Sequence, residues 1–268
     1  MKKKLLIIPI IFIVITGCNS NKYKLVWSDE FDYTGKPDST KWTHEIGGHG
    51  WGNNEWQYYT GELKNAEVKE GKLCITAYEE NFEDRKFTSA RLSTYKTEGL
   101  WTYGKIEASI KLPYGQGIWP AFWLLGANFR DVHWPACGEI DIMEMIGGAG
   151  RENTTHGTLH WRNLEGRHAQ SGGSRILDNG IFADAFHTFS IEWDPVYINW
   201  FVDGARIHEV RIDQPEFDAF HKNFYILLNL AVGGNWPGYP DSTTVFPQKL
   251  EVDYVRVYQK KAYTNKDS

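Results

Sequence analysis

The chain has 268 residues and a formal net charge of −5, from 29 Lys and Arg against 34 Asp and Glu. No basic cluster follows Lys4, so the charge pattern argues against a nucleic-acid partner. The length is normal for a single β-sandwich domain with a sizeable core, and no repeat, low-complexity tract or long linker divides the chain.

The N-terminus has the pattern of an export signal. Lys2–Lys4 are a charged region, and Leu5–Ile15 are an apolar stretch too short to span a bilayer stably. A Gly directly before Cys18 resembles the bacterial lipoprotein signal, in which the Cys becomes the lipid-bearing first residue. The alternative is an ordinary cleaved signal with an incidental Cys. We expect a lipoprotein-type signal peptide over 1–17 and a lipidated Cys18 with a short tether over 18–25.

A protein of this kind would be exported and anchored to a bacterial membrane, at the cell surface or in the periplasm. One domain is predicted over residues 26–260, with a charged tail over 261–268, and we expect a monomer. Beyond Cys18 only Cys74 and Cys137 remain, so no disulfide framework exists. A single bridge between these two is left open by the sequence.

Strand patterns recur along the chain, whereas helical periodicity is almost absent. Ile106 to Leu112 alternates apolar and polar side chains, which predicts one buried and one wet face, and residues 187–193 do the same. Asp203-Gly204 is the preferred two-residue turn of a hairpin. Phe224 to Val232 is a nearly continuous apolar run, as in a strand buried on both faces. The chain is therefore predicted to be all-β, a sandwich or jelly roll.

Three carboxylates are concentrated in the strand predicted from Glu139 to Glu144. Alternation places Glu139 and Asp141 on one face but sends Glu144 to the other. A β-bulge at Ile142-Met143 would return Glu144 to the acidic face, and bulges recur beside active sites. Such a row could be a solvated sheet face or an acidic metal site. It is also the arrangement of a glycosidase, in which one Glu attacks and another remains protonated as the acid.

Several unusual motifs accompany this stretch, in order, between about Val26 and Tyr258. They are Asn53–Tyr59, Tyr103–Glu107, Gly115–Gly126, Trp134–Glu144, His156–His160 and Asn229–Gly238. Together they resemble glycoside hydrolase family 16, the laminarinase-like endo-β-1,3-glucanases. The resemblance implies a jelly roll of two curved antiparallel sheets, with the substrate cleft on the concave side and no cofactor for the chemistry.

The resemblance also assigns roles to the three acids. It implies that Glu139 is the nucleophile, Asp141 the assisting carboxylate and Glu144 the general acid/base, whereas the residues alone leave open which Glu attacks. Met143 is absent from the resembling mixed-linkage lichenases and present in the laminarinase-like, agarase and carrageenase branches. The extra residue therefore narrows the branch without naming the polymer.

Aromatic and polar side chains at motif positions are expected to bind the substrate. Trp119 and Trp123 share a strand face, so both should line the cleft, with core packing as the alternative. Trp134 and the loop residue Trp236 are expected to be exposed platforms for the flat apolar faces of sugars. The complete expected set is Asn53, Arg91, Trp119, Trp123, Trp134, His156, His160 and Trp236.

The sequence raises two kinds of metal site. His156 and His160 share one strand face beside Glu144, but no third soft ligand lies at motif spacing, which disfavours a transition metal. The family resemblance implies a structural Ca²⁺ on the convex side, held by a carboxylate of the final strand and by early main-chain oxygens. The matching positions are Glu30, Gly71 and Asp253. Hard oxygen ligands suit Ca²⁺, and Asp253 is expected to share a strand face with apolar neighbours.

The resemblance implies an endo-acting, retaining hydrolase that cleaves β-1,3-glucosidic bonds of laminarin-type glucans by double displacement. A hydrolase of mixed-linkage β-1,3-1,4-glucan or of a marine galactan is an alternative, as is a transglycosylase. Sulfated galactans would require several cations, and only Arg91, Arg130 and Arg162 lie around the motifs. A non-catalytic β-glucan-binding protein is a further alternative, disfavoured because all three acids are present.

Overall fold

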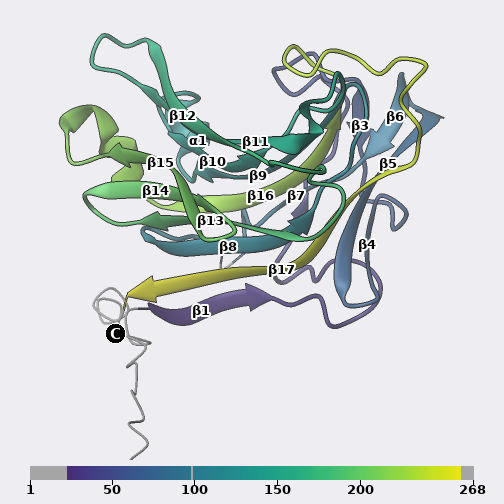
Figure 1. Ribbon diagram of the computed structural model, residues 1–268. Helices are drawn as coiled ribbons and strands as arrows, with labels where there is room; N and C mark the ends of the chain where they lie inside the picture. Colours follow the sequence, from purple (N-terminus) through teal and green to yellow (C-terminus); the bar gives the residue numbers. More distant parts are fainter. Residues whose placement is uncertain (1–22, 98, 261–268) are drawn as a thin grey trace, which may run out of the picture.

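The computed structural model describes residues 23–97 and 99–260. These residues form two curved β-sheets that stack face to face (Figure 1). The predicted signal peptide, Cys18 with most of its tether, and the tail over 261–268 lie outside the described residues.

One sheet has ten strands. They are β1 (Tyr23–Asp29), β3 (Gln57–Tyr59), β4 (Ala66–Lys69), β5 (Lys72–Phe82), β6 (Arg85–Ser89), β8 (Gly104–Lys111), β13 (His187–Trp193), β14 (Tyr197–Val202), β15 (Ala205–Arg211) and β17 (Gln248–Lys260). Their order is β15-β14-β13-β8-β17-β5-β6-β3, with β1 beside β17 and β4 beside β5. All pairings in this sheet are antiparallel except the one between β3 and β6.

The other sheet has seven strands, in the order β12-β11-β10-β9-β16-β7-β2. They are β2 (Thr43–His44), β7 (Arg91–Ser93), β9 (Ile118–Gly126), β10 (Glu139–Glu144), β11 (Thr154–Arg162), β12 (His168–Ile176) and β16 (Phe224–Val232). The helical segments described are short, namely α1 (Phe129–Val132), η1 (Arg151–Asn153) and η2 (Pro215–His221). Two large, mainly antiparallel sheets confirm the prediction of an all-β sandwich.

The hydrophobic core lies between the two sheets. Phe122 and Leu124 enter it from β9, Ile140 from β10, and Ile106 and Ile191 from the opposite sheet, all without exposed surface. The expected alternation holds on the core side of β8 and β13, but the outer side is not the wet face expected, since Glu107, Ser109 and Ser190 are at most 7% exposed. This core fixes which side chains of the seven-stranded sheet face the outside of the sandwich.

Strand β10 contains the bulge expected from the sequence. Its register against β9 shifts between Asp141 and Met143. Ile142 and Met143 both become buried in the core, at 1% and 0% exposure, instead of alternating. Glu144 is thereby returned to the outer face of the sheet, together with Glu139 and Asp141.

Strand β16 is buried on both faces, as its nearly continuous apolar run predicts. All nine of its residues are buried. Ile226 and Leu228 belong to the core between the sheets, whereas Tyr225 and Leu227 pack with Leu125 and Cys137 in a smaller cluster on the outer side. The smaller cluster supports the floor beside the acidic strand.

The ends of the described chain lie together. Tyr23 pairs with Lys260 across β1 and β17, and Figure 1 shows these two strands at the bottom of the view, with the seven-stranded sheet above. Cys74 and Cys137 are both buried and free, so they are not bridged. No helix within the described ranges is long and apolar enough to cross a membrane.

Candidate active site

The three acidic side chains of β10 line one cleft, of about 1390 Å³, on the outer, concave face of the seven-stranded sheet. Residues from β2 at one edge of this sheet to β12 at the other contribute to its walls. β10 lies between β9 and β11, with Glu139 opposite His160 and Glu144 opposite His156. The bulge and the register therefore place three carboxyl groups and two imidazoles in the same hollow.

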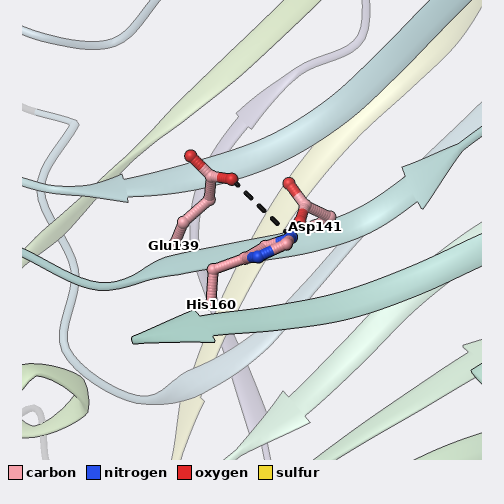
Figure 2. A group of neighbouring side chains, drawn as sticks. All are labelled: Glu139, Asp141 and His160. Atoms are coloured by element: carbon pink, nitrogen blue, oxygen red, sulfur yellow. Dashed lines mark ion pairs between the residues drawn. The ribbon is translucent and has the colours of Figure 1, made fainter. Parts of the chain in front are cut away.

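His160 joins the acidic row from the neighbouring strand. Figure 2 shows its ring reaching from β11 toward Glu139 and Asp141 on β10. Nε2 of His160 lies 3.1 Å from Oδ2 of Asp141 and 4.0 Å from Oε1 of Glu139. Oδ2 of Asp141 is buried and accepts no aligned hydrogen bond from the described residues. This oxygen therefore depends on a proton of its own or on the charge of His160 for its stability.

Glu139 and Asp141 influence each other's ionisation. Burial and the charge of Asp141 raise the pKa of Glu139, while the positive charges of His160 and Arg91 act to lower it. Burial raises the pKa of Asp141 to about 8. Two carboxyl groups this close lose their protons in two separated steps that belong to the pair. Between the steps the pair holds one proton, and a proton on Asp141 leaves Glu139 ionised, as a nucleophile requires.

Glu144 has the properties of a general acid. Burial and repulsion by Asp141 raise its pKa to about 8, whereas a hydrogen bond from Trp119 lowers it. The indole N–H of Trp119 donates that bond to Oε1 of Glu144 over 2.9 Å. A carboxyl group with this pKa remains protonated at neutral pH and can give its proton to a leaving oxygen.

All eight residues expected to bind substrate line the cleft. Trp119 and Trp123 line it from β9, and neither belongs to the core between the sheets, although Trp123 also packs against the smaller hydrophobic cluster. Trp134 and Trp236 are 44% and 41% exposed. Trp236 makes edge contacts with Trp119 and His156, at ring distances of 5.7 and 5.2 Å. Several indole rings therefore present apolar surface beside the carboxylates.

Arg91 is both an ion pair and a part of the cleft wall. Its Nε donates to Glu45 over 2.6 Å. Its guanidinium lies between the rings of Trp51 and Trp123, 4.7 Å from each ring centre. A cation held between two aromatic faces and paired with a carboxylate is fixed in orientation. The remaining N–H groups of Arg91 are thus held in place to meet a ligand in the cleft.

A buried polar network holds Trp123 from behind. The indole N–H of Trp123 donates to Asn229 over 2.7 Å, and the amide of Asn229 donates to the hydroxyl of Tyr59 over 3.2 Å. Tyr59 in turn donates to Glu55, which also accepts from Gln57. Burial raises the pKa of Glu55. Because its members satisfy one another, this network can stay dry and fix the ring of Trp123.

Sequence reasoning missed several residues of the cleft. Asn229 left a signal, since it is the polar residue within an otherwise apolar strand. Glu55 lies within the Asn53–Tyr59 motif but was given no role. Glu45 and Trp51 left no signal, because their roles depend on pairings across distant segments. His168 was missed as well, although its ring lies 4.6 Å from Trp134 and its Nε2 lies 2.9 Å from Nδ1 of His160.

One group within the described chain brings three metal-binding atoms close together, namely Glu139, Asp141 and His160, all within 4.8 Å of one another. A cation there would occupy the attacking oxygen of Glu139. The contacts of Glu139 and Asp141 with His160 are instead those of two catalytic carboxyl groups and a neighbouring imidazole.

The expected calcium residues lie at the ends of strands that pair in the other sheet. Asp29 pairs with Val255, and Leu73 pairs with Val252, so Glu30 follows the end of β1 and Gly71 precedes β5, both beside the part of β17 that holds Asp253.

The environment expected for Asp253 is wrong. A bulge between Val252 and Tyr254 turns it outward, so it is exposed and does not share the face of Val255. No cation of the described residues pairs with Asp253, whereas the carboxylate of Glu30 is held by Arg256 at 2.9 and 2.7 Å. The set therefore fits a hard cation through the Asp253 carboxylate and the main chain of Glu30 and Gly71.

The cleft is long, is lined by Trp and polar side chains, and contains two glutamates, of which Glu144 has the pKa of a protonated acid. These features define a glycosidase of the two-carboxylate class. The sequence model of the family described as glycosyl hydrolases family 16 matches residues 52–256. The chain belongs to this family, and the resemblance carried by the sequence motifs is confirmed.

Similar proteins agree with the family. A beta-glucanase from Rhodothermus marinus is 43% identical over 269 residues, covering 92% of this chain and 92% of that protein. The catalytic domain of an endo-1,3-beta-glucanase (laminarinase) from Thermotoga petrophila has a TM-score of 0.82 at 45% identity, over 90% of this chain and 99% of that one. The laminarinase from Rhodothermus marinus has a TM-score of 0.81 at 42% identity, over 89% and 98%.

Replacing Trp119 by Phe should move the alkaline limb of the pH profile of kcat/KM to higher pH. The hydrogen bond from Trp119 favours ionised Glu144, so its loss raises the pKa of the acid, which then stays protonated to higher pH. A hydrogen bond to a charged group is worth about 1.5–3 kcal/mol, so we expect a shift of about one pH unit in kcat/KM. Trp236→Phe, which removes a neighbouring indole without a bond to Glu144, should leave the limb in place. Equal profiles for Trp119→Phe and wild type would contradict the assigned bond.

Proposed function

We propose that the protein is an endo-acting, retaining glycoside hydrolase that cleaves β-1,3-glucosidic bonds in laminarin-type β-glucans. The single observation that carries the reaction class is the bulged strand β10, which places Glu139, Asp141 and Glu144 together in a cleft lined by Trp. Relatives named as beta-glucanase and laminarinase support the choice of polymer.

The chain's own residues account for both steps of double displacement. Glu144 donates its proton to the glycosidic oxygen while ionised Glu139 attacks the anomeric carbon, so the leaving sugar departs as an alcohol and a glycosyl ester forms on Glu139. Glu144, now ionised, takes a proton from water. The water oxygen displaces Glu139 from the anomeric carbon, and the original anomeric configuration returns. Asp141 holds the shared proton beside Glu139 in both steps.

The position of the acids along the cleft supports endo action. The cleft extends across the seven strands from β2 to β12, which is about 29 Å at about 4.8 Å per strand step. β10 has strands of the same sheet on both sides, so sugar units bind on either side of the acids. A bond inside a polymer can therefore reach Glu139 and Glu144.

The charge of the cleft favours a neutral polymer. Lys96, Arg91 and Arg130 are the Lys and Arg side chains among the described lining residues. Arg91 is paired with Glu45, and Arg130 stacks 5.6 Å from the ring of Tyr95. Arg162 lines a different hollow. A sulfated galactan would require a denser set of cations than this.

A product profile tests the proposal. Purified protein should release reducing ends from laminarin, with short oligosaccharides appearing early, and should do so faster than from lichenan, agarose or carrageenan. The Glu144→Gln protein, which keeps the shape of the acid without its proton, is the matched control and should be nearly inactive. Faster release from lichenan or a galactan would overturn the choice of polymer, and no release from any of the four would overturn hydrolysis.

We further propose that the protein is anchored to a membrane through a lipid on Cys18. The pairing of Tyr23 with Lys260 supports this proposal, because it places the first described residue, which follows the tether, at the end of the β1 and β17 pair. Figure 1 draws this edge below the sandwich and the seven-stranded sheet above it. Five residues span at most about 18 Å, so an anchor at Cys18 would hold the domain near the bilayer with the cleft turned away.

Replacing Cys18 by Ala should move the protein from the membrane fraction to soluble material or block its processing, because the acyl chains supply the membrane affinity. The measurement is fractionation of cells fed a labelled fatty acid. The buried Cys137→Ser protein is the control and should keep its label. Wild-type protein that is soluble and carries no label would contradict the anchor.

We also propose a structural Ca²⁺ at Asp253, with main-chain oxygens of Glu30 and Gly71 as further ligands. A ligand that binds only the folded state stabilises it by about 2.7 kcal/mol at a hundredfold excess over Kd. EDTA should therefore lower Tm by several degrees, at about 2–4 °C per kcal/mol for a domain of this size. Asp253→Asn should melt low and respond weakly to Ca²⁺, whereas Asp178→Asn at an exposed position should behave as wild type. Equal melting of wild type with EDTA and with Ca²⁺ would exclude the site.

A further inference from the structure

His168 lies at the start of β12 and belongs to no motif of the sequence, yet it contacts two cleft residues. Its ring stacks on that of His160, with ring centres 5.2 Å apart and an interplanar angle of 21°. On another side, the ring of Trp134 lies 4.6 Å away. His168 is therefore held between a partner of the catalytic acids and an expected sugar platform.

The contacts of His168 continue to the nucleophile. Its Nε2 lies 2.9 Å from Nδ1 of His160. The other ring nitrogen of His160 lies 3.1 Å from Oδ2 of Asp141 and 4.0 Å from Oε1 of Glu139. Three adjacent strands, β12, β11 and β10, thus supply one continuous series of polar contacts that ends at the carboxyl pair.

Both ring nitrogens of His160 have polar neighbours, His168 at Nδ1 and the carboxyl pair at Nε2, and this limits where protons can lie. Nε2 faces a carboxyl oxygen that accepts no aligned hydrogen bond from the described residues. A positively charged His160 carries a proton on both nitrogens, so Nδ1–H donates to His168 and Nε2–H faces Asp141. This arrangement requires His168 to be neutral. Burial and the charge of His160 both lower the pKa of His168, which agrees with that requirement.

We propose that His168 is a positioning residue for the cleavage proposed above: its Nε2 shares a hydrogen bond with Nδ1 of His160 and so holds the imidazole with Nε2 facing Asp141 and Glu139. Resting on that proposed function, the inference assigns His168 the task of fixing the ring of His160 beside the nucleophile. The residue touches neither acid itself and acts through His160.

Other charged groups around the pair are few. β10 contributes Glu139, Asp141 and Glu144, and β7 contributes Arg91, which acts on Glu139. Arg162 of β11 is opposite His168 in the strand register. The charge of His160 lowers the pKa of both Glu139 and Glu144. Displacement or loss of that charge should therefore raise the pKa of the nucleophile and of the acid together, so that both stay protonated to higher pH.

The test compares His168→Phe, which keeps an aromatic ring between His160 and Trp134, with His168→Gln, whose amide oxygen can accept from Nδ1. For His168→Phe we expect both limbs of kcat/KM on laminarin to move to higher pH by roughly half to one unit, with Tm unchanged and KM at the optimum changed less than about twofold. His168→Gln should restore most of the wild-type profile. His187→Phe, remote from the cleft on β13, should leave the profile unchanged.

A substrate-free measurement separates this inference from the proposed function. ¹⁵N NMR of the wild type should show Nδ1 of His160 in a hydrogen bond with His168, and His168→Phe should lose this signature. No such bond in the wild type, or the same His160 signals in His168→Phe, would overturn the role of His168 even if laminarin is cleaved. If laminarin is not cleaved but the NMR signature holds, the choice of substrate alone fails.

Discussion

The structure of the cleft depends on the confinement of three carboxyl groups to one face of a single strand. A regular strand would place Glu139 and Asp141 together and turn Glu144 into the core. The bulge at Ile142 and Met143 buries two apolar side chains in succession and so returns Glu144 to the cleft. Both the acidic row and a continuous core follow from one extra residue.

Three like charges in a half-buried hollow must be offset by neighbours or by protons. The protein uses both means. His160 and Arg91 supply positive charge near Glu139, and Trp119 donates a hydrogen bond to Glu144. Burial holds the pKa of Asp141 and of Glu144 each at about 8. Burial raises the pKa of Glu139 as well, so the row holds protons in the cleft, and the charges of His160 and Arg91 act to favour the ionised form of the nucleophile.

Local pattern predicted much of this. The alternation and bulge of β10, the two covered faces of β16 and the cleft positions of Trp119 and Trp123 all follow from side-chain periodicity, which needs no knowledge of pairing. The family motifs added the concave cleft and the other lining residues that were expected.

The parts that were missed depend on which strands meet. The stacking of Arg91 between Trp51 and Trp123 joins three separate segments, and His168 reaches His160 only because β12 is the neighbour of β11. Asp253 was assigned to the wrong face because a bulge in β17 interrupts the alternation. The trace of this shift is a change of phase in the apolar residues of β17, from Leu250 and Val252 to Val255 and Val257.

The central claim is that Glu139 attacks the sugar and Glu144 delivers the proton. The most direct measurement is the stereochemistry of azide rescue in the variants Glu139→Ala and Glu144→Ala. The substrate is an aryl β-laminaribioside that carries a good leaving group. With Glu139→Ala, azide can enter only from the face that the nucleophile vacates, so the product should be the α-glycosyl azide. With Glu144→Ala, the ester on Glu139 still forms, and azide should displace it to give the β-glycosyl azide. The opposite pairing of variant and product would contradict the account.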